Sequence, residues 1–356
     1  MIKFGLYGSG WRSEFFLRVA KLLPEKFEID GVITRNTEKA DYFKQTFKVK
    51  TYANLTDYLS ANTPQFIVES VNKGVSEEIT MEIINQKIPV LMETPAGKNI
   101  DSMIRLAEAV KKGAKIQIAE QYPFHPLHTT RKNIIDDHKL GTIQHAQVSF
   151  SHGYHGIALI RQALGINFEN AEISATKFQV SAVGGVSREG IPSKEKIATE
   201  IQTVATLLFE NGQTALYNFE MSQHRSWIRT PIVQIKGTHG EIFNETLKYL
   251  VDYATPVEVD FKRVNLGENQ NVEGFGLKGI LVGNNWYYRN PYPDSRLSDD
   301  ELAVAVCLDK MAHFVATGEE FYSFAQGAQD MYLGMMIEKA VAKGCVVKTD
   351  VMPWAR

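Results

Sequence analysis

The sequence predicts an α/β protein in which an N-terminal Rossmann domain, with a doubly wound parallel sheet, precedes a C-terminal α+β domain with a mainly antiparallel sheet. Short apolar runs alternate with helical patterns through the first 120 residues, which is typical of parallel βαβ units. The glycine turn Gly8-Ser9-Gly10 joins the first apolar run to the first helix, as in a dinucleotide-binding fold. Beyond residue 122, longer alternating runs separated by turn residues indicate hairpins.

In the first domain, strands and helices are expected in strict alternation. We predict strands over residues 2–8, 27–34, 66–71, 89–93 and 115–120. Helices are predicted over residues 11–23, 37–47, 77–86 and 101–112. Thr37 and Asp101 are expected to cap two of these helices, because short polar side chains accept hydrogen bonds from the first free N–H groups.

The second domain begins with a helix over residues 128–137 and a strand over 144–150, followed by a helix over 154–164 that ends at Gly165. Two hairpins are predicted next, 203–209 with 214–220 and 232–236 with 241–243, and helices over 300–316 and 327–343 complete the chain. No stretch has the composition of a flexible linker, so we expect domains 1–122 and 123–356 to pack firmly together.

Length and charge narrow the class of protein. At roughly 150 residues per domain, a chain of this length agrees with two domains. The sequence has 39 Lys and Arg against 41 Asp and Glu, so we expect neither nucleic acid nor a membrane as a partner. Cys307 and Cys345 give no disulfide framework, and the N-terminus lacks the layout of a signal peptide. We therefore expect a cytoplasmic protein.

The glycine turn has the spacing of a phosphate-binding loop. Gly8 permits the tight turn, Gly10 lets the backbone approach a pyrophosphate, and the helix that follows presents free N–H groups and its positive dipole end. Ser13 replaces the usual third glycine and is small enough for close packing of helix on strand. The alternative is a plain strand-to-helix turn, but position, spacing and the βα pattern together favour a cofactor site.

The end of the second predicted strand bears on the choice of cofactor. An acidic residue there would bind the ribose 2′-hydroxyl of NAD(H) and repel a 2′-phosphate. The sequence has Thr34-Arg35-Asn36 instead, and Arg35 can pair with a phosphate and stack on an adenine. The alternative role of Arg35 is that of a solvated surface residue. We predict NADP(H) as the cofactor, with NAD(H) as the alternative.

Motifs along nearly the whole chain point to one family. Besides the Gly8 turn they are Ser70-Val71-Asn72, residues 90–95 (VLMETP), 122–126 (YPFHP), 153–155 (GYH) and 235–240 (IKGTHG). They resemble those of the Gfo/Idh/MocA oxidoreductases, a family named for glucose–fructose oxidoreductase and inositol dehydrogenase. The resemblance implies an open sheet in the second domain, with substrate on one side and often an oligomer contact on the other. A homodimer or homotetramer formed through this sheet is therefore expected.

The resemblance and the glycine turn together give the expected cofactor site, in which Glu93 acts as a structural anchor rather than a base. The residues expected to bind the cofactor are Gly8, Ser9, Gly10, Trp11, Arg12, Thr34, Arg35, Ser70, Asn72, Glu93, Thr94 and Pro95.

Two departures from the family pattern affect the chemistry. The family's Glu-Lys-Pro reads Glu93-Thr94-Pro95 here, so a threonine replaces the lysine that can protonate a sugar oxygen. Proton transfer by a positioned side chain is worth about 10²–10⁴-fold in rate, so the loss has to be compensated or the chemistry differs. The family's Asp-x-x-x-His runs from Ser151 to His155, which keeps the histidine and loses the carboxylate.

A second, weaker likeness is to the thiazolinyl imine reductase branch of this family. The strand ending at Phe150 runs almost directly into the histidine motif, and Tyr122-Pro123 follows the strand over 115–120. In that branch the lysine position is also not lysine and a tyrosine is the proposed acid, which Tyr122 matches. The alternative role of Tyr122 is that of an aromatic at the domain interface.

The candidate catalytic residues are therefore His155, Tyr122 and Thr94. His155 has a pKa near neutrality in water, which suits proton donation to the product of hydride attack, although it can also simply cap its helix. Histidines at i,i+3 spacing, among them His152 and His155, are compatible with a metal, but without accompanying cysteines or acidic residues we expect no metal site.

Three further segments remain open at this level. Residues 184–190 (GGVSREG) suit either a loop near a substrate mouth or an ordinary surface hairpin. Residues 284–292 (NNWYYRNPY) can stack on a sugar or cover a subunit interface. His224 and Arg225 are able to reach a substrate, but the sequence does not decide whether they do.

Our leading interpretation is an NADP(H)-dependent oxidoreductase that moves a hydride between nicotinamide and a small polar substrate, a sugar or cyclic polyol. The first alternative is an NADPH-dependent imine reductase. The second is a catalytically silent, dinucleotide-binding regulatory protein, which the lost lysine and aspartate would fit.

Overall fold

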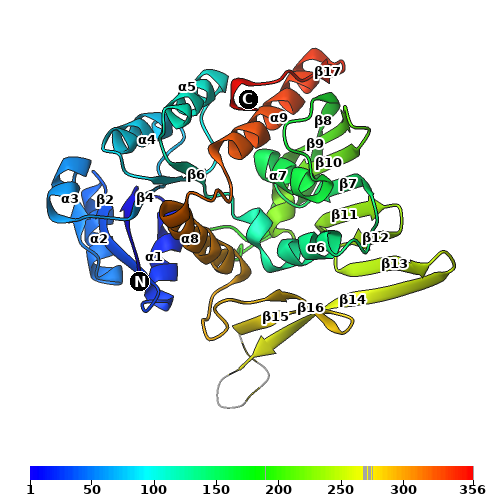
Figure 1. Cartoon of the computed structure of the whole chain (residues 1–356), viewed down its shortest axis with the longest axis horizontal. Helices are drawn as coiled ribbons and strands as arrows, with labels where there is room; N and C mark the ends of the chain where they lie inside the picture. Colours follow the sequence, from blue (N-terminus) through cyan, green and yellow to red (C-terminus); the bar gives the residue numbers. More distant parts are fainter. Residues whose placement is uncertain (189, 268–270, 272–273, 275, 356) are drawn as a thin grey trace.

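The computed structural model describes residues 1–188, 190–267, 271, 274 and 276–355 and confirms the predicted fold class. The N-terminal sheet is parallel, with the strand order β3-β2-β1-β4-β5-β6, and helices cover it (Figure 1). Its strands are β1 (Ile2–Tyr7), β2 (Phe27–Ile33), β3 (Thr51–Tyr52), β4 (Phe66–Glu69), β5 (Val90–Met92) and β6 (Ile116–Ile118). Its helices are α1 (Ser13–Leu22), α2 (Thr37–Phe47), α3 (Leu55–Ala61), α4 (Ser76–Asn85) and α5 (Ile100–Lys111).

The order of the strands reverses between β1 and β4, and ligands bind at such a reversal, beyond the carboxyl ends of the strands. Two predicted helix caps are wrong by one or two residues. Asn36, not Thr37, accepts from the backbone N–H of Lys39 at the start of α2. Asn99, not Asp101, caps α5, because its side chain and that of Ser102 form a reciprocal capping box.

The C-terminal sheet is mainly antiparallel, with the strand order β16-β15-β14-β13-β12-β11-β7-β10-β9-β8-β17 and a parallel pairing of β7 with β10. Its strands are β7 (Ile143–Ser149), β8 (Ala171–Val183), β9 (Ile197–Phe209), β10 (Thr214–Glu220), β11 (Ile232–Gly237), β12 (Gly240–Phe243), β13 (Thr246–Asp252), β14 (Thr255–Leu266), β15 (Gly276–Val282), β16 (Asn285–Arg289) and β17 (Val347–Lys348). The remaining elements are η1 (Tyr122–Phe124), α6 (Pro126–Asp136), α7 (Gly153–Leu164), η2 (Met221–Arg225), α8 (Asp299–Thr317), α9 (Phe324–Lys343) and η3 (Pro353–Ala355).

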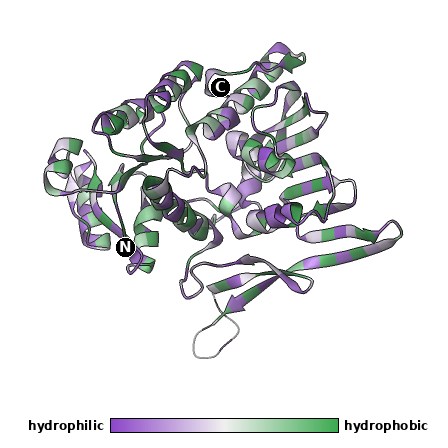
Figure 2. Cartoon of the chain, viewed as in Figure 1, coloured by the Kyte–Doolittle hydropathy of each residue, from purple (hydrophilic) through white to green (hydrophobic). Residues whose placement is uncertain are grey.

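The predicted hairpins are present, because β9 pairs with β10 and β11 pairs with β12 in antiparallel fashion. Hydrophobic and hydrophilic residues alternate along the strands of this sheet (Figure 2), so one face is apolar and the other mixed. Helices α6, α7 and α9 lie on the same side of the sheet (Figure 1). Leu207 of β9 and Ile235 of β11 are among the buried side chains of the sheet.

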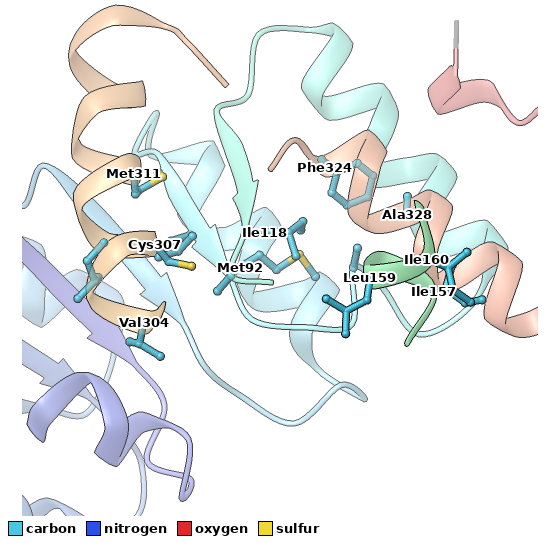
Figure 3. Packing of buried hydrophobic residues seen from close by; sticks show 14 of the residues in the cluster. Met92, Ile118, Ile157, Leu159, Ile160, Val304, Cys307, Met311, Phe324 and Ala328 are labelled. Atoms are coloured by element: carbon cyan, nitrogen blue, oxygen red, sulfur yellow. The ribbon is translucent and has the colours of Figure 1, made fainter. Parts of the chain in front are cut away.

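One hydrophobic core runs through both parts of the chain, as expected for domains that pack firmly together. Met92 of β5 and Ile118 of β6 lie between α8, which contributes Cys307, and α9, which contributes Phe324 and Ala328 (Figure 3). All five of these residues are buried. The last two helices of the chain therefore hold the N-terminal sheet, and the division at residue 122 stays a prediction.

Ion pairs join α8 to the N-terminal domain as well. Arg18 contacts Glu301 at 2.7 Å, and Lys26 contacts Asp309 at 2.6 Å. Among the described residues, none of the helices has the length and apolar character needed to cross a membrane.

Candidate active site

A cavity of about 940 Å³ opens where the carboxyl ends of β1, β4 and β5 meet the second domain. Every residue predicted to bind the cofactor lines it except Pro95, and so do the candidate catalytic residues His155, Tyr122 and Thr94. The second domain contributes further residues from α7, the loop after β8, η2 and α8, namely His152, Tyr154, Arg188, Met221, His224, Arg225 and Asp300.

The glycine turn has the geometry that a bound pyrophosphate requires. Gly8 has φ +132°, and a Cβ there would lie 2.0 Å from the carbonyl oxygen of Ser70, so no other residue fits. A Cβ on Gly10 would meet nothing within 4 Å, which leaves open space beside the backbone at the start of α1. Ser13 is fully buried and donates to Ser70 Oγ at 3.2 Å, as expected of a small residue at this position. The turn therefore fits the phosphates of a dinucleotide.

Thr34 and Arg35, directly after β2, line the cavity together with Ser9 of the glycine turn. The Thr34 hydroxyl donates to Ser9 Oγ at 2.8 Å, which ties the end of β2 to the glycine turn. Arg35 is exposed on the cavity wall. Its position suits contact with a group on the ribose 2′-oxygen.

Arg12 makes a contact that the sequence did not suggest. Its Nε donates to Glu93 Oε1 at 2.8 Å, and its Nη1 lies 4.0 Å from Asp300 Oδ2. Burial raises the pKa of Glu93, and the positive charge of Arg12 opposes that rise. Arg12 Nη2 is buried and has no hydrogen-bond partner among the described residues, so it remains available to an oxygen atom of a ligand. Glu93 therefore holds the guanidinium group of Arg12, and its role towards a cofactor stays a prediction.

The imidazole of His155 is held by a carboxyl group from outside its own motif. Nδ1 of His155 lies 2.6 Å from Glu120 Oε2, just beyond β6, and both side chains are buried. Burial, with the nearby charge of Arg12, lowers the pKa of the ring, while burial raises the pKa of the Glu120 carboxyl. The carboxylate lost at Ser151 thus has a replacement, which reaches the ring from a different strand.

Tyr122 packs directly against this histidine. Its ring centroid lies 4.6 Å from that of His155, and it stacks on His125 at 5.2 Å. His125 Nε2 in turn contacts Asp300 Oδ1 at 3.1 Å. Burial and the charge of Asp300 raise the pKa of the Tyr122 phenol, so at neutral pH it stays protonated and acts as a neutral hydrogen-bonding group.

Thr94, at the position of the family's lysine, lies close enough to Tyr154 for its hydroxyl group to lower the pKa of that phenol. Burial raises the pKa of Tyr154 to about 12. Its ring centroid lies 4.4 Å from that of His155. Among the described residues that line the cavity there is no lysine, so its protonatable groups are phenols, imidazoles and the carboxyl groups of Glu93 and Asp300.

His152 and His224 complete the substrate end of the cavity. Their ring centroids are 5.8 Å apart, and His152 lies 5.0 Å from His155. Burial lowers the pKa of each, to about 4, so both are neutral at physiological pH. Neutral imidazoles can donate and accept hydrogen bonds, which suits a substrate with several hydroxyl groups. Within the described part of the chain, no cluster of His, Cys, Asp or Glu is arranged to hold a metal ion.

The three segments left open by the sequence have different positions. In the loop after β8, the Arg188 guanidinium lies 4.1 Å from the centroid of the Trp11 ring, so this loop reaches across the cavity to the glycine turn. Glu189 of that segment lies outside the described residues. His224 and Arg225 line the cavity. Residues 284–292 lie elsewhere, and Tyr287 is buried with its carbonyl bound to Asn133.

The sequence reasoning missed Glu120, Tyr154 and Asp300. Glu120 carried a usable signal, because it ends a predicted strand at the edge of the sheet where sites form. Tyr154 stands directly before His155, in a motif whose histidine alone was a candidate. Asp300 lies in the first turn of α8 and contacts His125, which is 175 positions earlier in the chain. No local pattern indicates that contact.

Comparison with known proteins agrees with this geometry. No curated protein matches the chain by sequence. Residues 2–121 match the oxidoreductase family Gfo/Idh/MocA, described by its NAD-binding Rossmann fold. This match places the N-terminal part of the chain in the class of oxidoreductases with an NAD-binding Rossmann fold. Residues 2–121 thus match the Gfo/Idh/MocA family, and the resemblance inferred from the motifs is confirmed.

Solved structures share the fold over nearly the whole chain. A levoglucosan dehydrogenase in complex with NADH and levoglucosan has a TM-score of 0.71 at 14% identity, covering 98% of this chain and 99% of that one. An oxidoreductase from Agrobacterium radiobacter, in complex with NAD+, L-tartaric acid and magnesium, has a TM-score of 0.69 at 13% identity, with 98% of each chain covered. A myo-inositol dehydrogenase from Corynebacterium glutamicum has a TM-score of 0.66 at 13% identity, covering 98% and 99%.

Proposed function

We propose that this protein is an NADP(H)-dependent oxidoreductase that transfers a hydride between nicotinamide and a sugar or cyclic polyol. The observation that carries the proposal is the cavity itself, which is lined both by the glycine turn and by His155, whose ring is held from behind by the buried Glu120. The names of structural neighbours, a levoglucosan dehydrogenase and a myo-inositol dehydrogenase, support this substrate class.

The residues of the chain divide into two groups by role. The backbone from Gly8 to Arg12 and the start of α1 would hold the phosphates, with Asn72, Glu93 and Thr94 further along the cavity wall. When bound, nicotinamide supplies or accepts the hydride. The ring of His155 then gives a proton to, or takes one from, the substrate at Nε2, since Nδ1 is bound to Glu120. Tyr122 and Tyr154 flank this ring and donate hydrogen bonds as neutral phenols.

Arg35 underlies the preference for NADP(H), and its removal will show this. Arg35→Ala is expected to weaken NADPH binding about tenfold or more, because a hydrogen bond between charged groups is worth roughly 1.5–3 kcal/mol. The affinity for NADH will fall less, because NADH lacks the 2′-phosphate and loses at most the stacking of Arg35 on the adenine. Titration by nicotinamide fluorescence measures both, and Lys44→Ala, on the helix that follows Arg35 and paired with Asp41, is the control. Equal binding of NADH and NADPH, unchanged in Arg35→Ala, would contradict the assignment.

Imine reduction is the second candidate, and Thr94 is the observation that favours it. A carbon–nitrogen double bond needs no lysine to activate a hydroxyl group, so a threonine beside Tyr154 suffices at this position. The protonatable groups of the cavity serve either substrate.

A substrate panel separates these activities. Purified protein is mixed with NADP⁺ and polyols or aldoses, and with NADPH and cyclic imines, and absorbance at the nicotinamide band is followed. We expect turnover of a polyol or sugar. Turnover of imines alone would establish the second candidate instead. Tight cofactor binding with no turnover across both sets would indicate a regulatory protein that binds dinucleotide without reaction.

We also propose that a second copy of the chain covers the face of the C-terminal sheet opposite α6, α7 and α9. Phe178, Leu208 and Phe243 project from this face and are each more than two-fifths exposed. Apolar side chains of this size on an otherwise polar face are typical of a subunit contact. Light scattering after gel filtration will give a dimer or tetramer, and Leu208→Arg will shift it towards monomer. A wild-type chain that elutes as a monomer at micromolar concentration would exclude the contact.

A further inference from the structure

The Glu120 carboxyl is fixed at both of its oxygens. Oε2 contacts His155 Nδ1 at 2.6 Å, and Oε1 accepts from the backbone N–H of Tyr122 at 3.2 Å. Only 1% of Glu120 is exposed, so it reaches neither solvent nor the cavity. His155, by contrast, lines the cavity. The ring therefore stands between a buried carboxyl group and the place where a substrate binds.

Most charges around this pair are already neutralised by partners. Arg12 is bound to Glu93, His125 contacts Asp300, and Asp330 is bound to Arg161. The titratable and charged groups that face the pair from the surrounding elements are Arg12, Glu93, Tyr122, His125, His152, Tyr154, His224, Asp300, Cys307, Tyr322 and Asp330. Burial is the largest influence on both members of the pair, and it disfavours separated charges.

We propose that Glu120 and His155 act as one proton-holding unit, in which Glu120 orients the ring and replaces the proton that His155 gives to the substrate. The inference rests on the proposed function and names a positioning residue for it. After hydride reaches the carbon of a C=O or C=N group, the N–H bond at Nε2 breaks and an O–H or N–H bond forms on the substrate. The O–H bond of Glu120 then breaks as a bond forms between that proton and Nδ1. Glu120 is left as a carboxylate, and solvent returns the proton between turnovers.

The direction of the pH dependence follows from this arrangement. Burial raises the pKa of Glu120 to about 8, so the unit holds its proton below that pH and loses it above. Reduction consumes the proton and will slow as the pH rises through about 8. Oxidation releases a proton, which the unit can accept only after it has lost its own, so oxidation will speed up over the same range.

The unit is testable without turnover, by ¹⁵N NMR of the apo chain labelled at histidine. The Nε2 signal of His155, assigned by its loss in His155→Gln, is expected to report loss of a proton at about pH 8 in the wild type. Glu120→Gln keeps the shape of the side chain but has no titratable proton. In this variant, Nε2 of His155 is expected to lose its proton below neutral pH. Glu69→Gln is the matched control, since burial raises the pKa of Glu69 similarly and its bonds are to Ser76 and Val71.

Kinetics supply the second readout. Glu120→Gln should lower kcat about tenfold to a hundredfold with little change in KM and remove the inflection at about pH 8, as loss of proton supply does. A merely structural role would leave the pH profile of the variant in place.

Several results would overturn the unit. They are a wild-type Nε2 that loses no proton between about pH 6 and about pH 9, a Glu120→Gln chain with the wild-type NMR titration, and a Glu120→Gln chain with the wild-type kcat and pH profile. The wild-type titration decides the matter even if the variant fails to fold. The wild type can also titrate at about pH 8, with the shift in Glu120→Gln, and yet turn over no substrate. That result would support the Glu120–His155 unit and contradict the proposed function instead.

Discussion

His155→Ala will lower kcat at least about a hundredfold, because proton transfer by a positioned side chain contributes roughly 10²–10⁴-fold. The substitution removes an imidazole that is bound to a buried carboxyl group and also lines the cavity. Cofactor affinity will be unchanged, since the glycine turn and the end of β2 are untouched. Steady-state rates with the best substrate of the panel, and NADPH titration, measure the two quantities.

His145→Ala is the matched control for this experiment. His145 lies on β7, is bonded to Thr214 and does not line the cavity. Its removal should leave turnover near the wild-type value. If His155→Ala also retained a near-normal rate, His155 would have no part in proton transfer, and Tyr122 or Tyr154 would take its place as the donor to test.

Alanine at Gly8 will lower the stability of the chain, whereas alanine at Gly10 will leave its stability unchanged and weaken cofactor binding. In Gly8→Ala the new Cβ would lie 2.0 Å from the Ser70 carbonyl oxygen, at φ +132°. Such strain costs roughly 1–3 kcal/mol before the overlap is counted, so Tm will fall by several degrees. In Gly10→Ala the Cβ meets no protein atom within 4 Å, so Tm will be unchanged.

The Gly10→Ala chain will nevertheless bind NADPH about tenfold more weakly, because the methyl group occupies the space into which the pyrophosphate must come and crowding of this kind costs roughly 1–3 kcal/mol. Differential scanning fluorimetry and cofactor titration on the same preparations separate the two effects. A stable Gly10→Ala chain with undiminished affinity would place the phosphates elsewhere.

Local patterns were enough to predict most elements near the site. The spacing of Gly8 and Gly10, the alternation of apolar runs and the hairpin turn at Asn211-Gly212 all depend on neighbours in sequence, and each was found where predicted. The strands β3, β8 and β13 to β17 were not predicted. Strand β3 has only two residues, and β13 and β14 are so exposed that Leu247 and Phe261 are their only fully buried apolar side chains among the described residues.

The chemistry of the site depended on contacts between distant residues. The lost aspartate at Ser151 could be seen in the motif, but its replacement by Glu120 arises only when β6 and α7 meet. Likewise Arg12 looked like a cofactor ligand because of its place in the glycine turn, while the fold brings Glu93 and Asp300 to its guanidinium. Parallel strands bring their carboxyl ends to one edge of the sheet. The sequence therefore predicts which residues lie at that edge, but not which of them are in contact.

Isothermal titration of the purified chain with NADPH, and then with NADH, tests most directly whether the open space beside Gly10 receives a pyridine dinucleotide. We expect saturable binding of one NADPH per chain, with NADH weaker. Heat signals no larger than dilution for both coenzymes would contradict the assignment of the cavity and, with it, the catalytic and binding roles of the residues around it.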